Sequence, residues 1–186
     1  MEVTINKTRI SMTHGDITRQ NTDAIVNAAN SGLMGGGGVD GAIHRAGGPA
    51  ILEECKKIVA RQGRLPTGKA VITTGGNLKS QYVLHTVGPI WHGGSRNEAE
   101  LLRSAYNECL KLATENKLTS ISFPSISTGA YGYPVDEASK IAVNTVVSFL
   151  EQQATSLKEV VFVLFDSQTY RAYQTALEIC ANSLEG

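Results

Sequence analysis

Short apolar runs alternate with amphipathic helical patterns along most of this chain of 186 residues. Such alternation is typical of an α/β protein, in which helices cover the faces of a sheet. The apolar runs predict strands at Arg9–Thr13, Ala24–Asn27, Lys69–Thr73, Tyr82–Val87, Ser120–Pro124 and Val160–Phe165. Helical spacing predicts helices at Gly41–Ala46, Pro49–Arg61, Glu98–Asn116, Pro134–Gln152 and Ser167–Ser183. Residues 1–8 fit either a leading strand or a loose end.

Length and charge limit the classes of function. A chain of this size forms one domain, so we expect residues 1–186 to fold as a single unit. Lys and Arg together number 17, and Asp and Glu also number 17. This balance argues against general electrostatic binding of nucleic acid or of an anionic membrane. No apolar run is long enough for a signal peptide or a membrane span, so we expect a cytoplasmic protein.

Cysteines and histidines do not show metal-ligand spacing. The chain has three scattered cysteines, Cys55, Cys109 and Cys180, and the last two lie in apolar helical patterns that predict core positions. His14, His85 and His92 pair with no cysteine motif, and no Gly-x-Ser-x-Gly segment marks a nucleophilic serine. We therefore expect no metal ion, no cofactor and no cysteine or serine nucleophile.

A run of four glycines, Gly35–Gly38, follows the strand expected at Ala24–Asn27. Each glycine costs roughly 0.5–1 kcal/mol relative to alanine in regular structure, so the run suits a loop whose bare backbone approaches a ligand. Amide N–H groups without side chains bind phosphate well. The spacing of Gly36, Gly38 and Gly41 matches the dinucleotide fingerprint, but the strand ends too early and no acidic residue follows at the required distance. No Gly-Lys-Ser/Thr follows either, which argues against a P-loop.

A second loop, Ser125–Pro134, carries hydroxyls and glycines between an apolar strand and a helix. Its backbone N–H groups suit phosphate contact, and Tyr131 can lie over a sugar or a base. Two anion-binding loops match the two phosphates of a diphosphate. Because the carboxyl ends of parallel strands open onto one crevice, we expect both loops and the turn at Phe165–Ser167 to meet there.

Polar side chains flank the glycine run. Asp40, near a helix N-terminus, should be ionised and could orient or deprotonate water, or could simply cap the helix. His44 lies one helical turn further on the same face. Asn30 suits ribose hydroxyls, whereas Asn27 fits a structural role. Asp16 could accept a hydrogen bond from the exocyclic amine of adenine, or could be an ordinary turn residue.

Together these motifs resemble those of the macrodomain family, whose segments are present in order as Gly15–Thr18, Asp23–Asn30, Gly35–His44 and Ser127–Pro134. The unbroken Gly-Gly-Gly-Gly-Val-Asp-Gly-Ala-Ile-His string is similar to the hydrolytic branch, which includes bacterial O-acetyl-ADP-ribose deacetylases and animal mono-ADP-ribosyl hydrolases. The resemblance implies a three-layer α/β/α macrodomain fold with a central mixed, mostly parallel sheet that binds ADP-ribose.

The resemblance also implies where ADP-ribose would lie. The Asp16 carboxylate and the Ile17 backbone would hold adenine, and Phe165 would lie against its ring. The diphosphate and distal ribose would contact two sets of loop residues: Gly35, Gly36, Gly37, Gly38 and Val39, then Ser127, Thr128, Gly129, Ala130 and Tyr131. Ala130 stands where a larger aliphatic residue is common, which affects local packing and leaves its backbone donor in place.

The resemblance favours an enzyme that hydrolyses an ester on the distal ribose of ADP-ribose. Asn30, Asp40 and His44 match positions that the family associates with this ribose and with turnover. Substrates would be O-acetyl-ADP-ribose and mono-ADP-ribose linked to Asp or Glu of proteins, and either Asp40 or the substrate's phosphate would take the proton from water. The alternative is a module that binds ADP-ribose without turnover; a regulatory partner of RNA or protein and hydrolysis of ADP-ribose 1″-phosphate are more distant.

Overall fold

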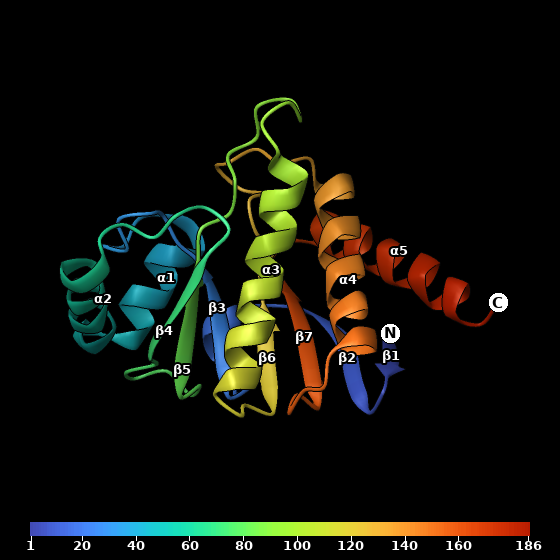
Figure 1. The fold of residues 1–186 in the computed structure, drawn as a ribbon, viewed down its shortest axis with the longest axis horizontal. Coiled ribbons are helices and arrows are strands. Elements are labelled where there is room, and N and C mark those ends of the chain that lie inside the picture. The colour runs from blue at the N-terminus through green and yellow to red at the C-terminus, as the bar shows by residue number, and fades with distance from the viewer.

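The computed structural model describes residues 1–186, and its centre is a seven-stranded sheet in the order β1-β2-β7-β6-β3-β5-β4 (Figure 1). The strands are β1 (Glu2–Ile5), β2 (Thr8–His14), β3 (Ala24–Ala28), β4 (Ala70–Thr74), β5 (Tyr82–Thr86), β6 (Ser120–Phe123) and β7 (Glu159–Leu164). Strands β2, β7, β6, β3 and β5 run parallel, and β1 and β4 pair antiparallel at the two edges. The predicted mixed, mostly parallel sheet is confirmed, and the start of the chain forms a strand.

Helices cover both faces of this sheet. They are α1 (Gly38–Gly47), α2 (Pro49–Gln62), α3 (Glu98–Glu115), α4 (Val135–Gln152) and α5 (Ser167–Leu184), with one short 3₁₀ helix, η1 (Ile17–Arg19). Helices α1 and α2 pack on one face, and α3, α4 and α5 pack on the other (Figure 1). The predicted three-layer α/β/α fold is therefore confirmed. No helix is both long enough and apolar enough to cross a membrane.

Strand β7 shows why apolar runs, rather than alternating patterns, predicted the sheet. Val160, Phe162 and Leu164 pack into the core beneath α3–α5, whereas Val161 and Val163 pack beneath α1 and α2. Successive side chains of a strand point to opposite faces, so a strand buried on both faces must be apolar at every position. The same arrangement fixes the direction in which each loop leaves the sheet.

The five parallel strands place their carboxyl ends at one edge. The glycine loop follows β3, the 125–134 loop follows β6, and Phe165 follows β7. Helix α1 begins at Gly38 rather than at the predicted Gly41, so Asp40 belongs to its first turn. Glycine has a low helix propensity, so the sequence predicted too late a start for this helix. In the structure, burial of Ile43 against the sheet outweighs that propensity.

Candidate active site

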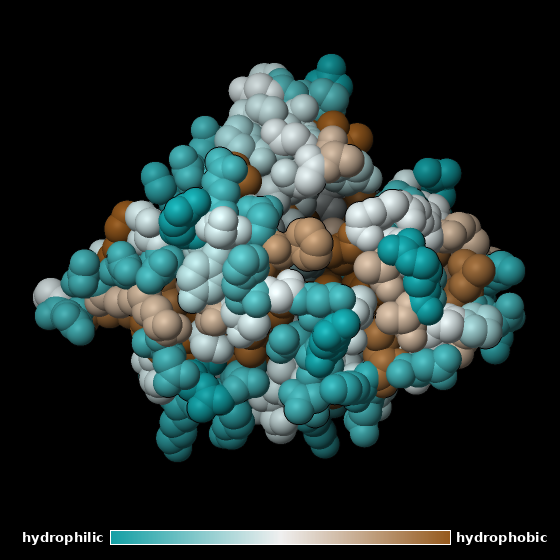
Figure 2. Space-filling model, turned by 180° about the vertical axis from the view of Figure 1, so that it is seen from behind, coloured by the Kyte–Doolittle hydropathy of each residue, from teal (hydrophilic) through white to brown (hydrophobic).

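A cleft of about 360 Å³ lies at this edge, between the glycine loop and the loop after β6. Its lining includes predicted site residues from both loops: Asn30, Gly36, Gly37, Gly38, Val39, Asp40, Ser127, Gly129, Ala130 and Tyr131. Figure 2 shows the surface from behind, hollowed beneath the projecting loop that follows β5. Gly35, Thr128 and His44 lie next to the lining residues without forming part of the lining.

Both loops present backbone N–H groups that have no acceptor within the chain. Residues 36–40 form the start of helix α1 and precede its first hydrogen-bonded donor, Gly41, so their amides have no acceptor in the chain, and all five residues line the cleft. The amides of residues 127–131 are likewise unpaired, and Ser127 turns the loop with a φ of +69°. Unpaired amides from two sides of one cleft form a site suited to a diphosphate.

Two buried tyrosines support the loop after β6 from below. Tyr106 of α3 accepts a hydrogen bond from the Ile126 N–H at 3.1 Å, and Tyr173 of α5 donates to Ser125 Oγ at 2.8 Å. The two hydroxyl oxygens lie 3.2 Å apart. Burial raises the pKa of Tyr106 well above its usual range, so this hydroxyl remains protonated. The loop is therefore held rigidly by the helices beneath it.

The loop after β5 supports the same region from above. The backbone N–H of Trp91 donates to the Tyr131 carbonyl oxygen at 2.8 Å. The ring of Trp91 packs on Tyr133, with ring centroids 4.6 Å apart. Glu98, at the start of α3, accepts hydrogen bonds from the N–H groups of His92 (2.8 Å) and Gly94 (2.9 Å). Burial raises the pKa of Glu98, but these backbone bonds outweigh burial and bring the pKa to about 2. A carboxylate that is ionised at neutral pH thus anchors this loop.

Asp40 lies in the corner between the glycine loop and α1, and it is 5% exposed. Its Oδ1 accepts a hydrogen bond from Asn27 Nδ2 at 2.8 Å and lies 3.4 Å from His44 Nε2. Its Oδ2 faces Gly36, where a Cβ atom would lie 3.2 Å from Oδ2 and 3.3 Å from Asn30 Nδ2. Asn30 also donates to the Gly35 carbonyl oxygen at 3.0 Å. The structure thus brings Asn30, Asp40 and His44 together at one corner of the cleft.

Behind Asp40 lies a polar network that the sequence reasoning missed. Asn27 Nδ2 contacts His85 Nδ1 at 3.1 Å, and His85 Nε2 contacts Thr73 Oγ1 at 2.8 Å. Burial, with a smaller effect from the charge of His44, lowers the pKa of His85 to about 3. Asn27 and His85 stand opposite each other in the pairing of β3 with β5. Nothing in the local sequence of either strand marks these two residues as partners, and the strand register was needed to join them.

Cys55 completes a Cys–His–Asn arrangement that has the composition of a nucleophilic site. Its Sγ lies 3.9 Å from His85 Nε2. Burial, together with nearby Asp40 and Glu54, raises the pKa of the thiol to about 11, and the thiol is fully buried. A nucleophilic cysteine needs a thiolate and access to substrate. Cys55 is therefore a core residue.

The predicted adenine-binding residues lie beside the cleft, at the ends of neighbouring strands β2 and β7. Phe165 is 82% exposed, and its carbonyl oxygen accepts a hydrogen bond from His14 Nε2 at 3.1 Å. Asp16 Oδ1 accepts a hydrogen bond from the Thr18 N–H at 2.9 Å and so caps the start of η1. Ile17, the first residue of η1, is buried. The exposed ring of Phe165 and the Asp16 carboxylate thus follow two neighbouring strands, and β7 is in turn the neighbour of β6.

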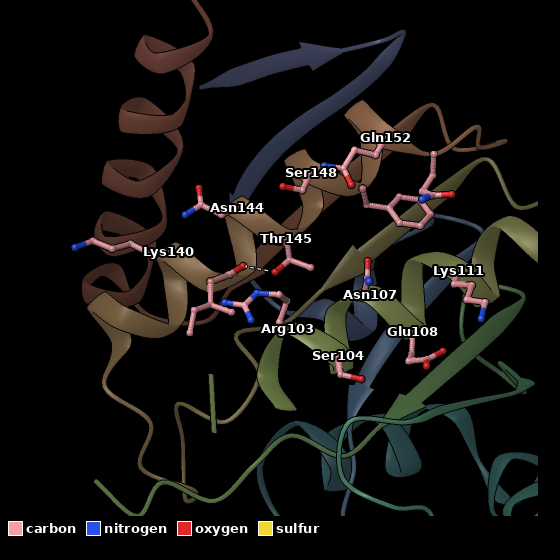
Figure 3. Close-up of a pocket in the computed structure, with 13 residues that line it drawn as sticks. Arg103, Ser104, Asn107, Glu108, Lys111, Lys140, Asn144, Thr145, Ser148 and Gln152 are labelled. Carbon is pink, nitrogen blue, oxygen red and sulfur yellow. Dashed lines mark hydrogen bonds between the residues drawn. The ribbon is translucent and has the colours of Figure 1, made fainter. Parts of the chain in front are cut away.

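A larger groove of about 700 Å³ runs between α3 and α4, on the outer side of the sheet (Figure 3). Its labelled side chains, among them Asn107, Lys140 and Asn144, come from the exposed flanks of the two helices. None of the predicted site residues lines it, and helical backbone leaves no unpaired amides there. The candidate site is therefore the smaller cleft at the sheet edge.

Fold and cleft together define an α/β/α protein with an anion-suited site at the carboxyl edge of its parallel strands. The chain belongs to the Macro domain family, whose sequence pattern matches residues 26–142. This membership confirms the resemblance found in the motifs.

Relatives of known name cover nearly the whole chain. A macro domain-containing protein of Caldanaerobacter subterraneus is 59% identical over 92% of this chain and 97% of its own length. The O-acetyl-ADP-ribose deacetylase of Citrobacter koseri is 55% identical over 92% of this chain and 96% of its own length.

Solved structures share the fold closely. The Oceanobacillus iheyensis macrodomain with ADP superposes with a TM-score of 0.93 at 45% identity, covering 98% of this chain and 97% of that one. The Trypanosoma brucei macrodomain in complex with ADP-ribose gives a TM-score of 0.83 at 42% identity, covering 90% and 68%.

Proposed function

We propose that this protein binds ADP-ribose and hydrolyses acyl esters on its distal ribose, with O-acetyl-ADP-ribose as a substrate. The observation that carries the proposal is the buried Asp40 carboxylate, whose Oδ2 faces Gly36 and Asn30 inside a cleft bordered by unpaired amides. The names of the deacetylase relatives and the nucleotides in the related structures support this reading.

Each part of ADP-ribose has a counterpart in the site. The diphosphate would lie between residues 36–40 and residues 127–131, where it satisfies their free N–H groups. Adenine would lie on Phe165, with its amine near Asp16. The distal ribose would then reach Asn30, whose carboxamide can both donate to and accept from ribose hydroxyls.

Hydrolysis then requires one activated water. Asp40 Oδ2 orients a water molecule toward the ester carbonyl carbon and accepts its proton, with a diphosphate oxygen as the competing acceptor. The water oxygen bonds to the carbonyl carbon, the bond from that carbon to the ribose oxygen breaks, and the ribose oxygen takes the proton that the water gave up. Acetate and ADP-ribose leave. A protein Asp or Glu ester of the same ribose presents the same carbonyl group, so we extend the proposal to mono-ADP-ribosylated proteins.

Asp40→Ala tests the proposal in a single-turnover assay of acetate release from O-acetyl-ADP-ribose. A positioned base contributes about 10²–10⁴-fold, so we expect a fall of that size in the rate, with ADP-ribose affinity by calorimetry mostly kept. Asp136→Ala is the matched control, because Asp136 is also a first-turn helix carboxylate but is exposed and does not line the cleft. An unchanged rate in Asp40→Ala would remove Asp40 from the mechanism.

The wild-type chain decides between enzyme and binding module. Binding of ADP-ribose without acetate release at saturating protein would identify a module that reads ADP-ribose. A panel of substrates tests the extension to proteins: we expect glutamyl-protein esters to react and arginine-linked ADP-ribose to resist. The arginine linkage should resist because it is an N-glycosidic bond and offers no ester carbonyl carbon for the water to attack.

A further inference from the structure

Asn27, His85 and Thr73 form a buried hydrogen-bonded network behind Asp40. We propose that His85 is a positioning residue, which fixes the Asp40 carboxylate through Asn27 so that one carboxylate oxygen is left free for water. This inference rests on the proposed ester hydrolysis. It concerns residues that neither line the cleft nor contact substrate.

Three adjacent strands and one helix supply the network. Asn27 of β3 and His85 of β5 are paired in the sheet, and Thr73 comes from β4 at the sheet edge. Asp40 enters from α1, which packs on this face. The side chains of Asn27, His85 and Thr73 are each at most 2% exposed. Their hydrogen bonds are therefore made in a region where water cannot substitute for a lost partner.

Only one arrangement of protons satisfies every contact. Asp40 Oδ1 can only accept, so the Asn27 atom that faces it must be Nδ2, and the second hydrogen of Nδ2 then points at His85 Nδ1. Nδ1 must accept, which places the ring proton on Nε2, where it donates to Thr73 Oγ1. The Thr73 hydroxyl in turn donates to the Thr74 carbonyl oxygen at 3.0 Å. The chain of donors is thus oriented from end to end.

This orientation is maintained against a cost in stability. Asn27 Oδ1 is buried and accepts no hydrogen bond. An unsatisfied buried acceptor costs about 1–3 kcal/mol, and such groups are rare enough in folded proteins that each calls for an explanation. A rotated Asn27 amide would instead turn its oxygen toward the carboxylate, so the amide is held by Asp40 and His85 together. Because Oδ1 of Asp40 is engaged in this way, Oδ2 is the oxygen that faces the cleft.

His85 serves this task only as a neutral ring. Burial lowers its pKa to about 3, with a smaller effect from the charge of His44, so the Nδ1 acceptor persists at neutral pH. His44 and Asp40 are the ionisable side chains facing it from α1, and Cys55 faces it from α2. A protonated Nδ1 would point its hydrogen at the Asn27 amide hydrogens. His85 therefore orients groups and does not transfer protons itself.

Two substitutions of His85 separate positioning from packing. His85→Leu places an apolar side chain of similar size at this position and removes the acceptor. We expect kcat for acetate release to fall about 10- to 100-fold, while KM and ADP-ribose affinity change by less than about threefold. His85→Asn places a carboxamide oxygen near the former Nδ1 and should restore most of kcat. Equal losses in both variants would overturn the proposal.

Ser122→Ala is the matched control for the loss of a buried hydrogen bond. Its hydroxyl lies 2.8 Å from Thr22 Oγ1, near the amino end of β3 and away from the cleft. We expect it to lower stability without changing kcat. If His85→Leu is as active as the wild-type chain, the positioning role of His85 is wrong, although the proposed ester hydrolysis stands. If the wild-type chain releases no acetate, the proposed function itself fails.

A measurement on the wild-type chain covers the case in which His85→Leu does not fold. Nitrogen-15 NMR of the histidine rings reports which nitrogen carries the proton. We expect His85 to show the Nε2–H tautomer and no titration between about pH 5 and pH 8. An Nδ1–H tautomer, or a ring that titrates in this range, would overturn the proposal without any activity assay.

Discussion

At the scale of single residues, the cleft depends on two glycines that touch through their backbones. A Cβ atom on Gly41 would lie 2.4 Å from the carbonyl oxygen of Gly36, inside contact distance. The second turn of α1 can therefore approach the glycine loop only because Gly41 has no side chain. This approach brings Asp40, one residue earlier, to the wall of the cleft.

Gly41→Ala should consequently lower stability, although alanine is the better helix former. Helix propensity alone favours alanine by about 1 kcal/mol, whereas a backbone clash of this kind costs about 1–3 kcal/mol. We expect a net loss in the free energy of unfolding measured with urea. Gly37→Ala is the control, because a Cβ atom there meets nothing within 4 Å. A more stable Gly41→Ala variant would contradict the close approach.

The residues of the cleft could be predicted from the sequence, and those behind it could not. A single short segment of the sequence contains Asn30, the four glycines and Asp40, so their spacing can be recognised as a motif. His85 and Thr73 carry no such mark, because each is a single polar residue in a strand and their meeting depends on the register of three strands. Register is set by packing of the whole sheet rather than by neighbours in the chain.

At the scale of elements, the loop after β5 is organised by the first residue of the helix that follows it. This loop is rich in glycine, and His92 is exposed on it. The backbone is nevertheless anchored, since Glu98 of α3 is 1% exposed and accepts from three N–H groups of the loop. Trp91 packs against Tyr133 and so connects this anchored loop to the loop after β6.

Glu98→Gln should make the free energy of unfolding less dependent on pH in the acidic range. The pKa of Glu98 falls from 4.5 to about 2 in the folded chain, so the carboxylate stabilises the fold above about pH 4.5. That contribution is lost as pH falls from about 4.5 toward 2, because the unfolded chain takes up the proton first. Urea unfolding at pH 6 and pH 3 should show a smaller difference for Glu98→Gln than for the wild-type chain. Equal differences would show that Glu98 does not anchor the loop through its charge.

Element positions followed from apolar patterns more reliably than element ends did. The five predicted helices and six predicted strands are all present, because burial on both sides of the sheet imposes long-range hydrophobic periodicity. The start of α1 was placed three residues late, since four glycines suggest a loop until packing of Ile43 is known. Strand β1 could not be assigned because its only neighbour is β2 at the sheet edge.

At the scale of the whole molecule, the two faces of the sheet differ in what they bury. The core beneath α3–α5 contains 31 buried residues, whereas the core beneath α1 and α2 contains 13. Asn27, His85 and Thr73 all belong to the smaller side, next to Cys55 and Ile51. The larger core therefore supplies most of the apolar burial, and the smaller one can contain polar groups that position the active site.

A neutral histidine in this smaller core should make the whole fold sensitive to mild acid. Burial lowers the pKa of His85 from 6.5 to about 3, so the unfolded chain binds a proton that the folded chain does not. Stability present above pH 6.5 is thus lost as pH falls toward 3, by at most about 1.4 kcal/mol per pH unit. We expect the free energy of unfolding in urea to be lower at pH 5 than at pH 7.

The variant His85→Asn tests whether this acid sensitivity comes from His85 rather than from the carboxylates, which titrate mainly below pH 5. Its free energy of unfolding should change less between pH 7 and pH 5 than that of the wild-type chain, whatever its absolute stability. His92→Asn, on the exposed loop, should retain the wild-type difference. If His85→Asn also retains it, then His85 is protonated in the folded chain, and the orientation deduced for Asn27 and Asp40 would no longer follow.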